Sequence, residues 1–282
     1  MKFFAGVRLL ISALILTGLG FGLQACSGGG GGGSSTPVDA NATGYYTGSA
    51  DVKTPASPAT NFNIPDLQIM INGSRIMMMS DAKAVLYDGT FTVSGNTLTS
   101  TVAIYYNGNK QTGAVGTATL NATITQGSQI TGSFTGTELG NGTFVSTYSS
   151  LNDTASIITN VEYDNTGANN RSWTTNPNEA TTGNNLEIEI YNNFDMRYNI
   201  SPGDLTFRNC VITKATNTNA YVPITNTSLF TVSVIFDNCD NPVAVNTGTY
   251  TGFSQYKPGT PNKIAFAITN GTYALTDDFN QI

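Results

Sequence analysis

The sequence predicts an all-β fold, in which an antiparallel meander barrel of about eight strands precedes a second, smaller antiparallel β domain. Three observations support this fold class. Residues 44–149 alternate apolar and polar side chains in short runs, and turn-forming dipeptides separate many of these runs. No stretch after the first 25 residues has convincing helical periodicity. Alternation with a period of two residues is the pattern of half-buried strands, so we expect serial β-hairpins.

Four turn-forming pairs divide the first region, at Asn72-Gly73, Asp88-Gly89, Asn107-Gly108 and Asn141-Gly142. Such pairs tolerate the positive φ angles that type I′ hairpins require. A meander of this length can close into an up-and-down barrel, which leaves no free strand edge. The region therefore resembles a lipocalin-like barrel domain over residues 44–149.

The second region, residues 186–282, contains five strand-like runs, among them "LEIEI" and "LFTVSVIFDNC". The intervening residues 150–185 are rich in Asn and Thr and contain the single tryptophan, Trp173. A bare loop of that length inside a compact unit is unusual. We therefore expect residues 150–185 to connect two domains.

An internal similarity links the two regions. "GYYTG" at residues 44–48 is followed by Lys53, an apolar run and an Asn-Gly pair. "GTYTG" at residues 248–252 is followed by Lys257, an apolar run and another Asn-Gly pair. Duplication and convergence on common strand chemistry both explain this pattern.

The N-terminal 25 residues have the order of a secretory signal, with basic Lys2 and Arg8, an apolar run and a small-residue exit. The apolar run is short and interrupted by glycine, whereas a membrane-spanning helix needs about 20 predominantly apolar residues. The exit, Leu23-Gln24-Ala25-Cys26, resembles the lipobox of bacterial lipoproteins. This resemblance implies cleavage before Cys26, a diacylglycerol on its sulfur, and a signal peptide over residues 1–25.

Residues 26–43 contain six consecutive glycines, and Gly/Ser-rich chains behave as flexible coils. We interpret this segment as a tether that holds a folded body away from the lipid headgroups. In Gram-negative lipoproteins, an Asp after the lipidated cysteine favours retention in the inner membrane. Ser27 stands there instead, so the resemblance implies an outer-membrane location, with the periplasmic or cell-surface side left open.

Composition excludes several classes of function. Loss of Lys2 and Arg8 with the signal peptide leaves 10 basic and 18 acidic residues, a net charge of −8. Such a surface repels phosphate backbones, so we expect no nucleic-acid partner. The chain has no histidine, which removes Ser-His-Asp catalysis and histidine-ligated zinc. We expect no catalytic residue, no cofactor and no metal.

Two cysteines remain after lipidation of Cys26, and in an exported chain the pair Cys210 and Cys239 indicates a disulfide. Two cysteines about thirty residues apart, the strand Gly248–Gly252 and a final hairpin over residues 264–275 also resemble uncharacterised outer-membrane lipoproteins of proteobacteria. That resemblance supports the disulfide and implies no activity.

The hairpin around Asn72-Gly73 carries the candidate ligand-facing residues. A two-residue turn there places Met70 opposite Arg75. One face of the hairpin is purely apolar, and the other is mixed and rich in sulfur. The mixed face consists of Gln68, Met70, Arg75, Met77 and Met79. If it lines the barrel lumen, it forms an adaptable site for a small apolar ligand. Packing in a core or against the second domain, and Cu(I) binding by thioethers, are the alternatives.

Two further clusters have ordinary structural explanations. Glu187 and Glu189 share one face of a strand and could match the carboxylate spacing of a glycosidase, or simply face water. "DNCDN" at residues 237–241 offers oxygen ligands for calcium, but it also suits a turn held by Cys239.

Two functions of different classes follow from these features. The first is a non-catalytic, outer-membrane-anchored lipoprotein that acts as an envelope or surface interaction module toward another macromolecule. The 13 tyrosines suit this function, because tyrosine provides contact area at low entropic cost. The alternative is a lipocalin-like carrier that binds a small apolar ligand in the N-terminal barrel.

Overall fold

The computed structural model describes residues 38–54, 60–153, 162–163, 172–174, 187–191, 196–198, 211–214, 219–237 and 247–281. These residues form strands, turns and short 3₁₀ segments without an α-helix, which confirms the all-β fold class. Residues Pro37–Ile282 belong to one compact unit. The predicted signal peptide, Cys26 and most of the tether lie outside the described residues. Within the described ranges, no helix is long and apolar enough to cross a membrane.

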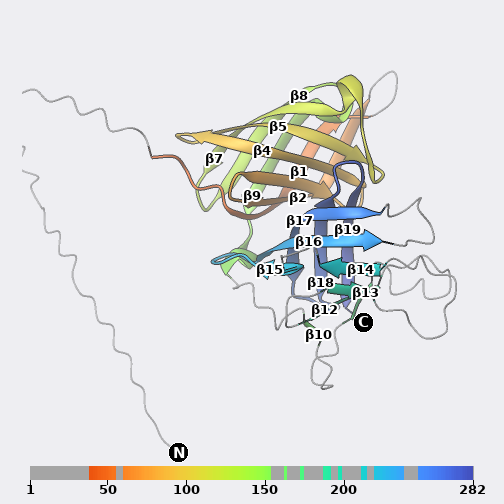
Figure 1. Ribbon diagram of the computed structural model, residues 1–282. Helices are drawn as coiled ribbons and strands as arrows, with labels where there is room; N and C mark the ends of the chain where they lie inside the picture. Colours follow the sequence, from red (N-terminus) through yellow and green to blue (C-terminus); the bar gives the residue numbers. More distant parts are fainter. Residues whose placement is uncertain are drawn as a thin grey trace, which may run out of the picture. The chain divides into compact units, whose positions relative to one another are not determined.

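Eight antiparallel strands close into a barrel (Figure 1). Consecutive strands pair with one another, and the first pairs with the last, so the predicted closed barrel is confirmed. A two-residue strand, β6 (Asn109–Lys110), pairs antiparallel with the end of β5 and is not one of the eight barrel strands. The barrel strands are β1 (Gly44–Lys53), β2 (Asn61–Asn72), β3 (Arg75–Ser80), β4 (Val85–Ser94), β5 (Thr97–Tyr106), β7 (Thr117–Thr125), β8 (Gln129–Gly136) and β9 (Gly142–Tyr148).

The turn predictions hold at two of the four positions. Gly73, with a φ of 59°, and Asn107, with a φ of 49°, both lie in tight turns between strands. Asp88-Gly89, in contrast, lies inside β4. A Cβ atom on Gly89 would stand 2.6 Å from the Thr101 carbonyl oxygen of β5, so this glycine allows close strand approach instead of a turn. At Asn141-Gly142, Asn141 has an extended φ of −127° and Gly142 is the first residue of β9, so this pair does not form a type I′ turn.

The register of the β2–β3 hairpin differs from the prediction, but the two faces do not. Asn72 pairs with Arg75 and Met70 pairs with Met77, because the turn residues are Gly73 and Ser74. The pairing is therefore shifted by two residues. Since side chains alternate with a period of two, such a shift leaves each residue on its predicted face.

Apolar and aromatic side chains fill the barrel interior. Tyr87 stacks on Phe134 with ring centroids 4.5 Å apart, and Phe134 contacts Phe144 at 5.4 Å. The Tyr87 hydroxyl donates a hydrogen bond of 2.8 Å to the Leu139 carbonyl, which satisfies a polar group inside this core. The apolar face of the hairpin contributes Ile69, Ile71, Ile76 and Met78 to the same interior. An eight-stranded barrel has an interior of about the width that side chains fill.

The second sheet follows the order β10-β12-β11-β19-β18-β17-β16-β14, with β13 beside β12 and β15 beside β16. All its ladders are antiparallel except β10–β12. The predicted connecting segment thus contributes two strands, β10 and β11. The elements are β10 (Glu162–Tyr163), β11 (Ser172–Thr174), β12 (Glu187–Tyr191), β13 (Met196–Tyr198), β14 (Val211–Lys214), β15 (Tyr221–Pro223), β16 (Leu229–Asp237), β17 (Gly248–Lys257), β18 (Lys263–Thr269) and β19 (Ala274–Gln281).

One face of this sheet has its own aromatic core. Trp173 is completely buried there, with its ring 6.3 Å from that of Tyr256. Tyr221 stacks on Phe230 at 4.5 Å, and its hydroxyl shares a 2.7 Å hydrogen bond with Ser254. The sheet therefore has a hydrophobic core separate from that of the barrel.

A third core cluster joins the outside of the barrel to the other face of the second sheet, and we call this contact the seam. Its buried members are Tyr45, Met70, Met77, Met79, Leu86 and Tyr105 from the barrel, with Ile224, Leu229, Phe253, Ala265 and Ala267 from the second region. Backbone hydrogen bonds reinforce the seam where the β5–β6 turn meets the β18–β19 turn. Lys110 N–H donates to the Thr272 carbonyl at 2.9 Å, and Ala274 N–H donates to the Gly108 carbonyl at 2.9 Å.

Candidate functional site

The predicted ligand-facing residues lie on the outside of the barrel and not in its lumen. Met70, Met77 and Met79 are fully buried members of the seam. Arg75 pairs with Asp88 at 2.9 Å and also donates to the Thr251 hydroxyl of β17 at 3.1 Å. The purely apolar face points inward because it contains no group that needs water or a partner. The mixed face is covered by the second sheet, and its contact with a ligand stays a prediction.

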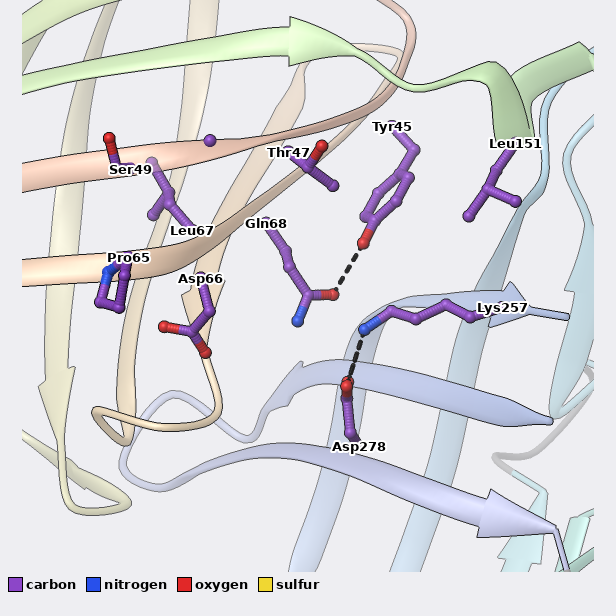
Figure 2. Close-up of a pocket in the computed structure, with 11 residues that line it drawn as sticks. Tyr45, Thr47, Ser49, Pro65, Asp66, Leu67, Gln68, Leu151, Lys257 and Asp278 are labelled. Carbon is purple, nitrogen blue, oxygen red and sulfur yellow. Dashed lines mark hydrogen bonds and ion pairs between the residues drawn. The ribbon is translucent and has the colours of Figure 1, made fainter. Parts of the chain in front are cut away.

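The fifth of these residues, Gln68, lines an open pocket of about 670 Å³ between the barrel and the second sheet (Figure 2). We call this cavity the seam pocket. It is lined by Tyr45, Thr47, Gly48, Ser49, Pro65, Asp66, Leu67, Gln68, Leu151, Lys257 and Asp278.

An irregularity in the β1–β2 ladder shapes one side of the seam pocket. Gly48 pairs with Leu67 and Ala50 pairs with Ile64, so the single residue Ser49 lies opposite two residues of β2. Those two residues are Pro65 and Asp66, and proline cannot donate to a ladder. Such bulges redirect side chains, and they are frequent next to functional sites.

Gln68 and Tyr45 form the buried floor of the seam pocket. The Tyr45 hydroxyl donates a 2.9 Å hydrogen bond to the Gln68 Oε1 atom, which fixes the orientation of the amide. Gln68 is only 6% exposed, and among the described residues its Nε2 atom has no hydrogen-bond partner. That nitrogen points toward the space between Asp66 and Asp278 (Figure 2). A buried donor without a partner costs about 1–3 kcal/mol, so this amide is suited to donate a hydrogen bond to a ligand oxygen.

The wall contributed by the second sheet carries a closely paired cation and anion. Lys257 Nζ lies 2.8 Å from both carboxylate oxygens of Asp278, and the two side chains are 20% and 16% exposed. Burial, together with the negative charge of Asp278, raises the pKa of Tyr45. The Tyr45 hydroxyl therefore stays protonated at neutral pH and remains a donor to Gln68.

Asp66 is held in place from the barrel side. Its carboxylate accepts a 2.5 Å hydrogen bond from the Ser80 hydroxyl and a 3.0 Å hydrogen bond from the Ala82 N–H. These bonds fix the acceptor oxygens beside Gln68, and carboxylate oxygens have lone pairs for further donors. The seam pocket thus presents a free amide donor next to oriented carboxylate acceptors.

A second, smaller pocket of about 230 Å³ lies elsewhere along the seam and contains a carboxyl pair. Asp81 follows β3, and Asp277 belongs to β19. Burial raises the pKa of Asp277 to about 7, and the nearby charge of Asp81, a hydrogen bond with Asp81 and the charge of Asp278 act in the same direction. Burial also raises the pKa of Asp81. The pair therefore takes up a proton as the pH falls through about 7.

The remaining candidates from the sequence are only partly described. Glu187 and Glu189 lie on β12 and alternate with the buried Ile188 and Ile190, and their side chains lie outside the description. Cys26, Cys210, Cys239 and residues 238–241 also lie outside the described residues. Among the residues that the structure describes, no group of three or more acidic, cysteine or histidine side chains could hold a metal ion.

Sequence reasoning missed Tyr45, Lys257 and Asp278, which lie far apart along the chain. Tyr45 lies in the "GYYTG" segment, and Lys257 follows the "GTYTG" segment on the same strand, β17. The first segment and the lysine that follows the second both line the pocket, so the repeated pattern was the one sequence signal that could have identified Tyr45 and Lys257. No protein-family model matches this chain, and comparisons with curated proteins and with solved structures give no match either.

Proposed function

We propose that this chain is a non-catalytic lipoprotein interaction module, anchored to the outer membrane by diacylglycerol on Cys26. The signal-like N-terminus, the Leu23–Cys26 lipobox and the glycine-rich tether over residues 26–43 support the anchor. Two or three acyl chains hold a protein far more firmly than one.

The observation that carries the interaction role is the filled barrel interior. Tyr46, Tyr87, Phe134 and Phe144 occupy the space in which a barrel carrier holds its ligand. Recognition is therefore left to the outer surface of the body, where the seam pocket is a concave site with polar groups. Sites of this kind combine a few fixed polar groups with apolar walls.

The anchor is tested by feeding cells an alkyne-labelled fatty acid and comparing the wild-type chain with Cys26→Ser. We expect label and outer-membrane fractionation only with the cysteine. Ser27→Asp is a matched variant, which should keep the label and shift the protein toward the inner membrane. Label that persists in Cys26→Ser would contradict the proposed anchor.

The closed eight-stranded barrel favours a second candidate function, a lipocalin-like carrier for a small apolar ligand. Native mass spectrometry on the Cys26→Ser protein, purified without detergent, separates the two functions. A carrier retains the extra mass of an apolar molecule, which is lost on denaturation, whereas the interaction module retains no apolar molecule. The bare mass would count against the carrier.

The disulfide between Cys210 and Cys239 is part of the same proposal. Its support is in the sequence, because Cys210 and Cys239 are the two cysteines left after lipidation of Cys26, and exported chains pair such cysteines. The mass of the intact protein, measured before and after reduction, tests this bond.

A further inference from the structure

We propose that the seam pocket binds a neutral, hydroxyl-rich ligand of the saccharide class, and that the Gln68 amide recognises one of its oxygens. The inference deepens the proposed function by naming what the interaction module binds at this site. It follows from the hydrogen-bonding groups, the charges and the size of the pocket.

The hydrogen-bonding groups in the pocket require a ligand that both donates and accepts. The Gln68 Nε2 group is a donor without a partner among the described residues, and it is fixed by the 2.9 Å bond from Tyr45. Asp66 and Asp278 are acceptors only, with oriented oxygens. A hydroxyl group can accept from the amide and donate to a carboxylate at the same time. Neighbouring hydroxyls on a sugar ring supply several such groups within a few ångströms.

The charges around the pocket do not favour an ion. Lys257 is engaged by both oxygens of Asp278 at 2.8 Å, so its charge is largely neutralised. An anion would meet the carboxylate of Asp66 without a free cation to compensate it. A cation would have to compete with Lys257 for Asp278, and the desolvation of partly buried ions opposes this exchange. A neutral ligand avoids both costs.

An apolar ligand fits the pocket poorly. It would cover the Gln68 amide without supplying an acceptor, and burial of an unpaired donor is unfavourable. The volume of about 670 Å³ lies in the range of small-molecule sites and is large enough for one or two sugar rings. Leu67, Leu151 and Pro65 contribute apolar wall against which the C–H faces of a sugar can pack.

The test is titration of the mature Cys26→Ser chain with neutral saccharides, followed by amide NMR and calorimetry. The probes are glucose, maltose, the N-acetylglucosamine disaccharide and a neutral oligosaccharide released from the O-antigen of lipopolysaccharide. We expect binding of at least one probe. Preference for the released O-antigen oligosaccharide would identify an envelope source, and preference for the simple sugars would identify a free one.

Gln68→Met removes the amide at nearly constant volume, beside the existing Met70 and Met79. We expect it to weaken saccharide binding by about tenfold or more, because each 1.4 kcal/mol lost is a factor of ten. The matched control is Gln129→Met on β8, where the side chain is exposed. This control should bind as the wild type does. Thermal unfolding of both variants verifies that they are folded.

Three outcomes would overturn the inference. The first is absence of binding by every saccharide at millimolar concentration, and the second is unchanged binding by Gln68→Met. The third is binding of inorganic phosphate or glycine at the pocket in place of the sugars. Each of these outcomes leaves the fatty-acid labelling of Cys26 unaffected, so failure of the ligand class is distinguishable from failure of the proposed anchored module.

Discussion

At the scale of single residues, the seam contains a titratable group whose chemistry determines how stability responds to pH. Asp277 has an ordinary pKa of 3.8 when exposed, and burial with neighbouring carboxylates raises it to about 7 in the folded protein. The folded state therefore binds more protons than the unfolded state between these values. The contribution of Asp277 to the free energy of unfolding is therefore greatest below pH 3.8, and it falls as the pH rises toward 7.

Asp277→Asn should remove that dependence. We expect the variant to be more stable than wild type at pH 8 by roughly 2 kcal/mol, because one pKa unit is about 1.4 kcal/mol and partial exposure screens part of the effect. At acid pH the two proteins should differ little. Urea unfolding at a series of pH values measures this difference. If the free energy of unfolding depends on pH in the same way for both proteins, the raised pKa of Asp277 is contradicted.

Gly48 provides a steric prediction at the same scale. A Cβ atom there would stand 1.9 Å from the Val145 carbonyl oxygen of β9, a backbone atom that cannot move independently. Gly48→Ala should lower the free energy of unfolding by roughly 2–4 kcal/mol. Gly127→Ala is the comparison, because its φ of 64° disfavours alanine but no atom lies within 4 Å of the added Cβ. It should cost only about 1 kcal/mol, and equal losses would contradict the steric argument.

At the scale of elements, the repeated sequence pattern corresponds to repeated local structure. "GYYTG" opens β1 and "GTYTG" opens β17, and their first glycines have φ angles of 143° and 144°. Tyr46 and Tyr250 both point into aromatic cores. These equivalences make the two segments structurally alike, while duplication and convergence remain alternative origins.

The second region gives a prediction about its cysteines. Removing the proposed disulfide by replacing Cys210 and Cys239 with serine should open a loop of about 30 residues and lower stability by roughly 3–4 kcal/mol from loop-closure entropy. Unfolding with and without reductant measures the effect. The reductant should destabilise the wild type and leave the double variant unchanged, and equal behaviour of the two would show that no disulfide forms.

Strand alternation and turn chemistry made the barrel predictable, because both are encoded locally. The two faces of the β2–β3 hairpin follow from alternation alone, and a shift of two residues in register does not change them. Asp88-Gly89 was mistaken for a turn because sequence cannot show that Thr101 approaches Gly89 from another strand. The seam pocket was not predictable, since Tyr45, Gln68 and Lys257 meet only through long-range packing.

At the scale of the whole molecule, the seam makes the barrel dependent on the second sheet. Met70, Met77, Met79 and Leu86 are buried only where the two parts meet. A fragment of residues 37–153 would expose them as one apolar patch, and patches of this kind cause association.

We therefore expect the isolated barrel to self-associate in solution, whereas the longer chain of residues 37–282 should not associate through this surface. Analytical ultracentrifugation of both proteins tests the expectation. A Met77→Lys variant of the fragment serves as the control, because a charge in the centre of the patch should restore a monomer. A wild-type fragment that is monomeric at high concentration would contradict this role of the seam.

The closure of the barrel also has a mechanical consequence. Under the anchor proposed above, a pull from the membrane would reach the folded body through the chain that leads into β1, the first of the described strands. β1 has hydrogen-bonded ladders with both β2 and β9, and Asp39 is tied to the Gly95 N–H just before it. Extracting this strand requires breaking two ladders together. The body should therefore resist shear at the cell envelope, and the glycine-rich tether should extend long before the fold yields.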